Sequence, residues 1–153
     1  MVRWMRDRTV RLNVGVRTTP TLSTTRRWIA RALRDDTIRP FAILIDGEHV
    51  GNVVLDRIDR HLGTARLSIY IGKRSTRGKG VGRTAVGLAL RQAFGPLRLR
   101  KIWLTVHERN RPAVETYLSL GFVVEGILRD EFRLGREWIN ALYMGILARE
   151  VGE

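Results

Sequence analysis

Hydrophobic and polar positions alternate along the chain in short blocks, and the first three blocks have the character of strands. Apolar runs at 41–45, 49–55 and 64–72 have strand length and are rich in β-branched residues. Asp46 and Gly47 separate the first two runs. This dipeptide is typical of a tight hairpin, because both turn positions need a positive φ. The three runs are therefore expected to form an antiparallel meander.

Apolar residues recur at helical spacing in other segments, which are expected to be helices at 23–34, 81–94 and 110–120. Ser23 or Thr24 is expected to cap the first helix, and its apolar face would carry Trp28, Ile29, Ala32 and Leu33. Asn110 is expected to cap the third helix, with Pro112 in its first turn. The residues at 4–13 are mixed in character and could form a short helix or a loop.

Three more apolar runs, at 101–106, 122–128 and 138–147, complete the predicted strands. The order after the first helix is three strands, a helix, a strand, a helix and two strands. This order indicates an α/β fold in which helices pack on a mixed sheet. The 153 residues suit a single domain spanning 1–153, which is long enough to build a core without disulfides.

Composition excludes several classes of protein. The chain has no cysteine, which rules out disulfide scaffolds, thiolate zinc sites and cysteine nucleophiles. No apolar run approaches the roughly 20 residues of a membrane helix, and the N-terminus lacks an apolar signal segment. We therefore expect a cytoplasmic protein without a membrane partner, and no metal site.

The chain is strongly basic, with a formal net charge of +13 at pH 7. Only three of its 28 basic residues are lysines, namely Lys73, Lys79 and Lys101. Such a field attracts anions, so nucleic acid, a phosphorylated cofactor or an acidic substrate would all fit. A genomic bias toward arginine codons would explain the composition equally well. The arginines are spread along the chain, which makes a nucleic-acid-binding module the weaker alternative.

A glycine-rich basic segment at 72–82 lies between the third strand and the next helix. Gly78, Gly80 and Gly82 would let the backbone approach an anion, and the helix start offers N–H groups and a partial positive charge. The cationic side chains in and beside the segment are Arg74, Arg77, Lys79 and Arg83. This pattern indicates a phosphate-binding loop, and a tight turn without a ligand is the alternative.

Two common phosphate-binding motifs fit this segment poorly. A P-loop needs G-x-x-x-x-G-K-S/T, but the fifth position after Gly72 is Arg77, and Gly80 follows Lys79 where a hydroxyl should bind magnesium. A dinucleotide-binding fingerprint can be forced onto 80–85, but antiparallel strands precede it and no repeated strand–helix–strand array follows.

Two sequence elements together resemble the GNAT family of N-acetyltransferases. The acetyl-CoA motif of that family, Q/R-x-x-G-x-G/A, is matched at every fixed position by 77–82. A second element, N-x-x-A-x-x-x-Y-x-x-x-G-F, is matched by Asn110, Ala113, Tyr117, Gly121 and Phe122. The resemblance covers about 36–149. The stretches 4–11 and 125–131 resemble a branch that acetylates ribosomal-protein N-termini, spermidine and nucleotide-linked amino sugars.

The resemblance implies a mostly antiparallel mixed sheet, splayed between its middle strands, with helices on both faces and acetyl-CoA wedged in the split. The family usually has a strand ahead of its first helix, whereas this chain starts at about that helix. Tyr117 stands at the position of the general acid that protonates the departing thiolate, although a core tyrosine is the alternative. The expected cofactor-binding residues are Ile71, Arg77, Gly78, Lys79, Gly80, Val81, Gly82, Arg83 and Asn110. In this set a backbone N–H near Ile71 would bind the acetyl oxygen.

The acceptor is expected to be a small-molecule amine or a protein N-terminus. Many family members have a carboxylate base where this chain has Thr105, and His107 and Glu108 are weak substitutes. Without a strong base, a lysine amine of pKa roughly 10.4 needs about 4.6 kcal/mol to lose its proton at pH 7, whereas an α-amine needs about 1–1.4 kcal/mol. This favours an α-amine or an amino sugar, attacking directly in a ternary complex.

Spermidine would be repelled by the net charge unless an acidic pocket compensated for it, and the candidates for such a pocket are Asp35, Asp36, Asp56 and Asp59. The missing carboxylate at Thr105 leaves a second possibility open, a catalytically silent CoA-binding regulatory protein. A homodimer formed through the last strand, 138–147, is also possible.

Overall fold

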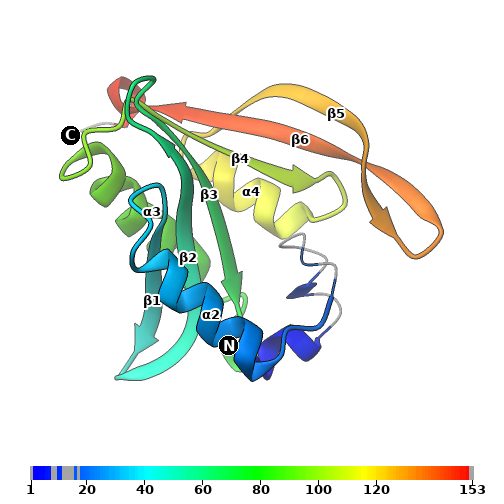
Figure 1. The fold of residues 1–153 in the computed structure, drawn as a ribbon. Helices are drawn as coiled ribbons and strands as arrows, with labels where there is room; N and C mark the ends of the chain where they lie inside the picture. Colours follow the sequence, from blue (N-terminus) through cyan, green and yellow to red (C-terminus); the bar gives the residue numbers. More distant parts are fainter. Residues whose placement is uncertain (1, 8–9, 12–15, 17, 152–153) are drawn as a thin grey trace.

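The computed structural model describes residues 2–7, 10–11, 16 and 18–151, and six strands form one sheet in the order β1-β2-β3-β4-β6-β5 (Figure 1). The strands are β1 (Arg39–Ile45), β2 (Glu48–Asp59), β3 (Thr64–Ile71), β4 (Lys101–His107), β5 (Val123–Leu134) and β6 (Glu137–Leu147). The helices are α2 (Leu22–Ala32), α3 (Val81–Phe94) and α4 (Arg111–Ser119), with 3-10 turns η1 (Trp4–Arg6), η2 (Arg74–Thr76) and η3 (Ala148–Glu150). This confirms the predicted α/β class and the order of elements.

The turns that the sequence predicts have the backbone geometry they require. Asp46 and Gly47 both have positive φ, 48° and 77°, and they join β1 to β2 as an antiparallel hairpin. Gly121 follows α4 with a φ of 92°, a conformation that a residue with a Cβ seldom adopts. These glycines fix where the adjoining strands and helix end.

The sheet is splayed between β3 and β4. These two strands pair in parallel only from Thr64–Lys101 to Arg66–Trp103, and beyond that point they diverge (Figure 1). β4 instead pairs along its length with β6. The predicted splay is confirmed. Among the described residues no strand precedes α2; residues 8–9, 12–15 and 17, where part of the expected helix or loop at 4–13 falls, lie outside the described part of the chain.

Helices cover both faces of the sheet, as predicted. Neighbouring residues of a strand point to opposite faces. Val53 and Leu55 of β2 accordingly contribute to the main core, together with residues of α3 and α4. Val54, between them, packs with Ala32 of α2 on the other face. In Figure 1, α2 crosses one side of β1–β3 and α3 lies behind the same strands.

The start and the face of α2 differ from the sequence expectation. The capping residue is Thr21, not Ser23 or Thr24: its hydroxyl accepts the Thr24 N–H at 3.1 Å, and the Thr24 hydroxyl accepts the Thr21 N–H at 2.9 Å. The extended backbone at Thr21 makes this reciprocal cap possible. The helix buries only part of its apolar face, because Ile29 and Leu33 remain 39% and 73% exposed.

Within the described residues, none of the helices combines the length and the apolar character needed to cross a bilayer. The same part of the chain contains no group of three or more His, Asp and Glu side chains arranged to hold a metal ion.

Candidate active site

The divergence of β3 and β4 opens a cleft with a volume of about 1160 Å³. Its walls come from both strands, from the loop before α3, from α4 and from the β5–β6 hairpin. Of the residues predicted to form the site, those that line the cleft are Ile71, Arg77, Gly78, Gly80, Gly82, Arg83, Asn110 and Tyr117. The tertiary structure therefore brings together two sequence elements that lie about thirty residues apart.

Lys79 and Val81 have a different position from the rest of the predicted set. Both line a second cavity of about 510 Å³, between β1 and α3, instead of the large cleft. Successive residues of the loop lie on opposite sides of the chain: Gly78, Gly80 and Gly82 border the large cleft, and Lys79 and Val81 border the second cavity. Any contribution of these two residues to the cleft would come from their backbone.

The loop before α3 has the geometry of an anion-binding turn. Gly78 and Gly80 have φ of 72° and 78°, and a Cβ at either position would meet nothing within 4 Å. Gly80 is the N-cap of α3 and has no side chain to cap it; its carbonyl accepts the Thr84 N–H at 3.0 Å. The first N–H groups of the helix lack intrahelical partners and carry partial positive charge, so this end of the cleft favours an anion.

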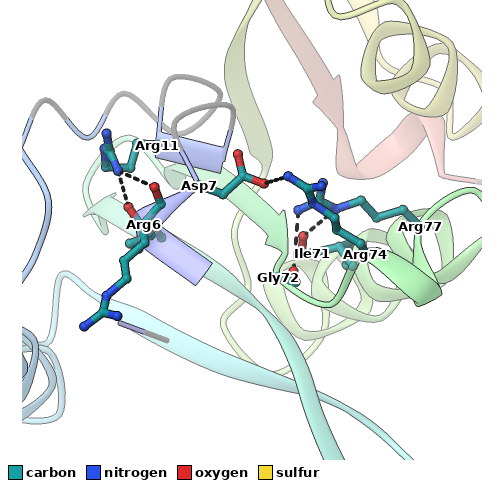
Figure 2. A network of polar contacts seen from close by, with 8 residues as sticks. Arg6, Asp7, Arg11, Ile71, Gly72, Arg74 and Arg77 are labelled. Carbon is teal, nitrogen blue, oxygen red and sulfur yellow. Dashed lines mark hydrogen bonds and ion pairs between the residues drawn. The ribbon is translucent and has the colours of Figure 1, made fainter. Parts of the chain in front are cut away.

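Two arginines hold this loop against the rest of the protein (Figure 2). Arg77 donates its Nε–H to the Ile71 carbonyl at 3.0 Å and lies 3.5 Å from the Gly72 carbonyl through Nη2. Arg74 forms an ion pair with Asp7 at 3.0 Å, which links η2 to the N-terminal segment. The guanidinium of Arg77 thus fixes the loop to the end of β3.

The strand geometry directs the N–H of Ile71 toward the cleft. The next residue, Gly72, donates its N–H to the Val50 carbonyl of β2 at 2.8 Å. Successive N–H groups of a strand point to opposite edges. The Ile71 N–H therefore points away from β2, to the edge from which β4 has diverged. That is where the sequence resemblance places the donor to an acetyl oxygen.

Tyr117 belongs to the core and also to the cleft. Its side chain is 8% exposed, its ring centroid lies 5.7 Å from that of Phe122, and it lines the cleft. Burial raises the pKa of Tyr117 to about 12, so the hydroxyl is protonated at neutral pH. The two interpretations of this residue, core tyrosine and proton donor, are therefore compatible.

Asn110 precedes α4 at the N-cap position, but its side chain makes no capping hydrogen bond. The expected side-chain cap is wrong. Its backbone carbonyl accepts the N–H groups of Ala113 and Val114, each at 3.1 Å, and this satisfies the helix start. With ψ at 62°, the residue is outside the extended conformation that usual caps adopt. Asn110 lines the cleft.

Comparison with known proteins agrees with this geometry. The family model described as an acetyltransferase (GNAT) domain matches residues 1–123. The chain belongs to the GNAT acetyltransferase family. A spermidine N(1)-acetyltransferase of Escherichia coli K12 is 35% identical over 118 residues, which cover 77% of this chain and 63% of that protein. The chain thus spans less than two thirds of the length of this curated relative.

Solved GNAT structures share the fold. The spermidine N-acetyltransferase of Vibrio cholerae, in complex with CoA and spermine, superposes with a TM-score of 0.92 at 26% identity, covering 98% of this chain and 89% of that one. A dodecameric structure of the Vibrio cholerae enzyme has a TM-score of 0.77 at 30% identity, covering 84% and 75% of the two chains.

The residues that the sequence suggested as a general base for the acceptor amine do not line the cleft. Thr105 lines it, but His107 and Glu108 do not. His107 is buried with its ring 5.6 Å from that of Phe132, and burial, reinforced by Arg109, lowers its pKa. The carboxylate that reaches the cleft is Glu131 of β5, inside the 125–131 stretch that resembles the family branch.

Sequence reasoning also missed part of the arginine-rich wall: Arg77 and Arg83 were predicted site residues, but Arg57, Arg66 and Arg133 were not. The lining arginines are Arg57, Arg66, Arg77, Arg83 and Arg133, and Glu131 is the acidic side chain among the described lining residues. Arg66 forms a two-pronged ion pair with Asp56, at 2.8 and 2.7 Å, and this partner raises the pKa of Arg66. The alternation of side chains along β2 and β3 was the only sequence signal for these arginines. It could not show which face of the strands borders the cleft, because that depends on where the sheet splits.

The aspartates considered as an acidic pocket do not form one. None of the four lines the cleft, and three of them serve local structure. Asp35 accepts the hydroxyl and N–H of Thr37 at 2.6 and 3.0 Å, Asp56 binds Arg66, and Asp59 accepts the Leu62 N–H at 2.8 Å. The four aspartates therefore supply no acidic pocket for a polyamine, although Asp56 offsets the charge of the cleft-lining Arg66.

Proposed function

We propose that this GNAT protein is an acetyl-CoA-dependent N-acetyltransferase that acetylates a primary amine by direct attack in a ternary complex. The observation that carries the proposal is a single cleft lined by the glycine loop, Ile71 and Tyr117. The Vibrio cholerae relative that binds CoA and spermine has the same fold over nearly the whole chain, which supports it.

The residues present suit acetyl-CoA. Open space at the Cβ positions of Gly78, Gly80 and Gly82 leaves room for a diphosphate beside the main-chain N–H groups of 77–83. Arg83 also lines the cleft and adds cationic charge, and Asn110 presents an uncommitted amide side chain. CoA would supply the thioester, and these residues would bind and orient it.

In the reaction, the amine nitrogen bonds to the acetyl carbon, the carbon–sulfur bond breaks, and one proton moves overall from nitrogen to sulfur. The Ile71 N–H would stabilise the oxygen as it gains charge. Tyr117 would donate a hydrogen bond to the departing sulfur. Complete proton transfer from a phenol of pKa about 12 to a cysteine-like thiolate of pKa about 8.5 would cost roughly 5 kcal/mol. Contact with the charge that develops on the sulfur must lower this cost for Tyr117 to act as the general acid.

Two arguments bear on the acceptor class, the relatives and the charge of the cleft, and they favour different acceptors. The E. coli and Vibrio cholerae relatives are spermidine acetyltransferases, so a polyamine is one acceptor to test. The arginine-rich cleft favours an acceptor with oxygen groups or negative charge, such as an amino sugar or a protein N-terminus. A low-pKa amine also suits a site whose lining carboxylate, Glu131, is exposed.

A thiol-release assay with acetyl-CoA and a panel of amines tests the proposal. We expect turnover with at least one primary amine and saturable binding of CoA in calorimetry. CoA binding without turnover of any amine would favour a regulatory CoA-binding protein. Salt-sensitive binding of nucleic acid with no heat from CoA would favour the nucleic-acid-binding alternative. Self-association stays a prediction, which sedimentation measurements would test; a related Vibrio cholerae structure is dodecameric.

A further inference from the structure

A chain of three polar side chains crosses β2 and β3 at the edge of the cleft. The Nε2 of His49 lies 2.9 Å from the Oδ1 of Asn52, and the Nδ2 of Asn52 donates to the Tyr70 hydroxyl. Trp4 stands edge-on to the rings at both ends, with centroid distances of 5.0 Å to His49 and 6.2 Å to Tyr70. Tyr70 is thereby held in one position, and it is the member of the three that lines the cleft.

The direction of these hydrogen bonds leaves the proton of Tyr70 available. An amide nitrogen can only donate, so the Tyr70 oxygen accepts from Asn52 and its own hydrogen must point elsewhere. Within the described part of the chain, no other hydrogen bond to that hydroxyl is observed. Burial raises the pKa of Tyr70 to about 12, so the hydrogen is present at any physiological pH.

The excess of arginines over carboxylates in the cleft lining favours a partner with oxygen groups or negative charge. Arg57 lines the cleft with its guanidinium over the Trp103 ring at 6.0 Å, whereas the ion pair with Asp56 offsets the charge of Arg66. A polyamine presents only ammonium and methylene groups at neutral pH, and an ammonium cannot accept a hydrogen bond. An acceptor that carries a hydroxyl, carboxylate or phosphate oxygen can do so.

We propose that Tyr70 determines acceptor specificity by donating a hydrogen bond to an oxygen of the amine substrate, with Asn52 as the positioning residue. The preferred acceptor is then an oxygen-bearing primary amine, such as an amino sugar or an amino acid, over a polyamine. This inference rests on the proposed acetyltransferase function and extends it to the substrate.

The test compares Tyr70→Phe with wild type in the thiol-release assay. The probes are a hexosamine, a hexosamine phosphate, an amino acid and spermidine, each with saturating acetyl-CoA. We expect wild type to prefer one of the oxygen-bearing amines. Tyr70→Phe should raise its KM about tenfold with little change in kcat, and should leave the weak rate with spermidine unchanged. Tyr143→Phe, a tyrosine outside the cleft lining, is the matched control and should behave as wild type.

Asn52→Asp tests the direction of the hydrogen bond. A carboxylate at this position would accept the Tyr70 proton in place of donating to its oxygen, so the variant should also raise the acceptor KM although the tyrosine is intact. Combining it with Tyr70→Phe should add little, because both changes remove the same donor. An unchanged acceptor KM in Asn52→Asp would contradict the assigned direction.

The outcomes separate this inference from the proposed function. Turnover of spermidine as the best substrate, or an equal effect of Tyr70→Phe on all four amines, would overturn the inference and leave the acetyltransferase intact. An absence of turnover with any primary amine would overturn both. Unchanged CoA binding and thermal midpoint in Tyr70→Phe are required, since a purely structural role would move them along with KM.

Discussion

The indole of Trp4 lies against Gly72 so closely that a Cβ on Gly72 would stand 1.9 Å from Cδ2 of the ring. Gly72 directly follows β3, and its carbonyl lies near the guanidinium of Arg77. The N-terminal segment thus rests on the point where the strand passes into the anion-binding loop, and the ion pair of Asp7 with Arg74 adds a second link (Figure 2).

Gly72→Ala should destabilise the protein by about 1–3 kcal/mol, because the added methyl group and the Trp4 ring cannot occupy the same space. Urea unfolding followed by circular dichroism measures the change. Gly126→Ala is the control, since a Cβ there meets nothing within 4 Å. Trp4→Ala combined with Gly72→Ala should cost less than the sum of the two single changes; strict additivity would argue against the contact.

Gly80→Ala should weaken CoA binding, because φ at this position is 78° and an L side chain is strained there. The strain costs about 1–2 kcal/mol of stability or moves the main-chain N–H groups out of place. Gly82→Ala separates the two causes: its backbone is helical, so it should keep or raise stability while still adding a methyl group near the cleft. Calorimetry and urea unfolding measure both effects. If Gly80→Ala bound CoA with wild-type affinity, this would contradict a role of the loop in CoA binding.

Tyr117→Phe should lower kcat by about 100-fold or more while changing CoA affinity little, because it removes only the hydroxyl that we propose as the donor to the departing sulfur. The packing of the ring against Phe122 is preserved. Steady-state kinetics and calorimetry on the same preparation give the two numbers. Tyr143→Phe serves again as the comparison, and an unchanged kcat in Tyr117→Phe would exclude the proposed role.

The raised pKa of Tyr117 predicts a loss of stability at high pH. The unfolded tyrosine ionises near pH 10, whereas the folded one keeps its proton until about pH 12. Its contribution is therefore complete below about pH 10 and falls as pH rises toward 12, because the unfolded state loses the proton first. Unfolding free energies at pH 8 and pH 11 should differ less in Tyr117→Phe than in wild type. Equal differences would contradict the burial of the hydroxyl.

Local patterns in the sequence predicted most of the elements correctly. The Asp46–Gly47 hairpin, the glycine loop at 78–82 and the strand at 101–106 each depend on residues within a few positions of one another. The cap of α2 was wrong, because Ser23, Thr24 and Thr21 offer similar hydroxyls and only the backbone conformation selects among them. The prediction that the Asn110 side chain caps α4 was also wrong, again because the backbone conformation decides whether a side chain can cap.

Part of the wall of the site could not be predicted, because it comes from strands that meet only in the folded sheet. Tyr70 and Arg57 line the cleft, but they belong to strands with an alternating pattern of polar and apolar residues. Such a pattern is the same whether the polar face of the strand borders solvent or a cleft. Glu131 reaches the cleft from β5 because the β5–β6 hairpin extends past the end of β4.

The elements, the glycine loop and the GNAT resemblance follow from the amino-acid sequence alone, since φ preferences, hydrophobic period and motif spacing act over short distances along the chain. The short pairing of β3 with β4 over three residues, the contact of Trp4 with Gly72, and the presence of Tyr70 and several arginines in the cleft lining emerge only in the folded protein. Those features depend on strand order and register, which follow from the packing of the whole core.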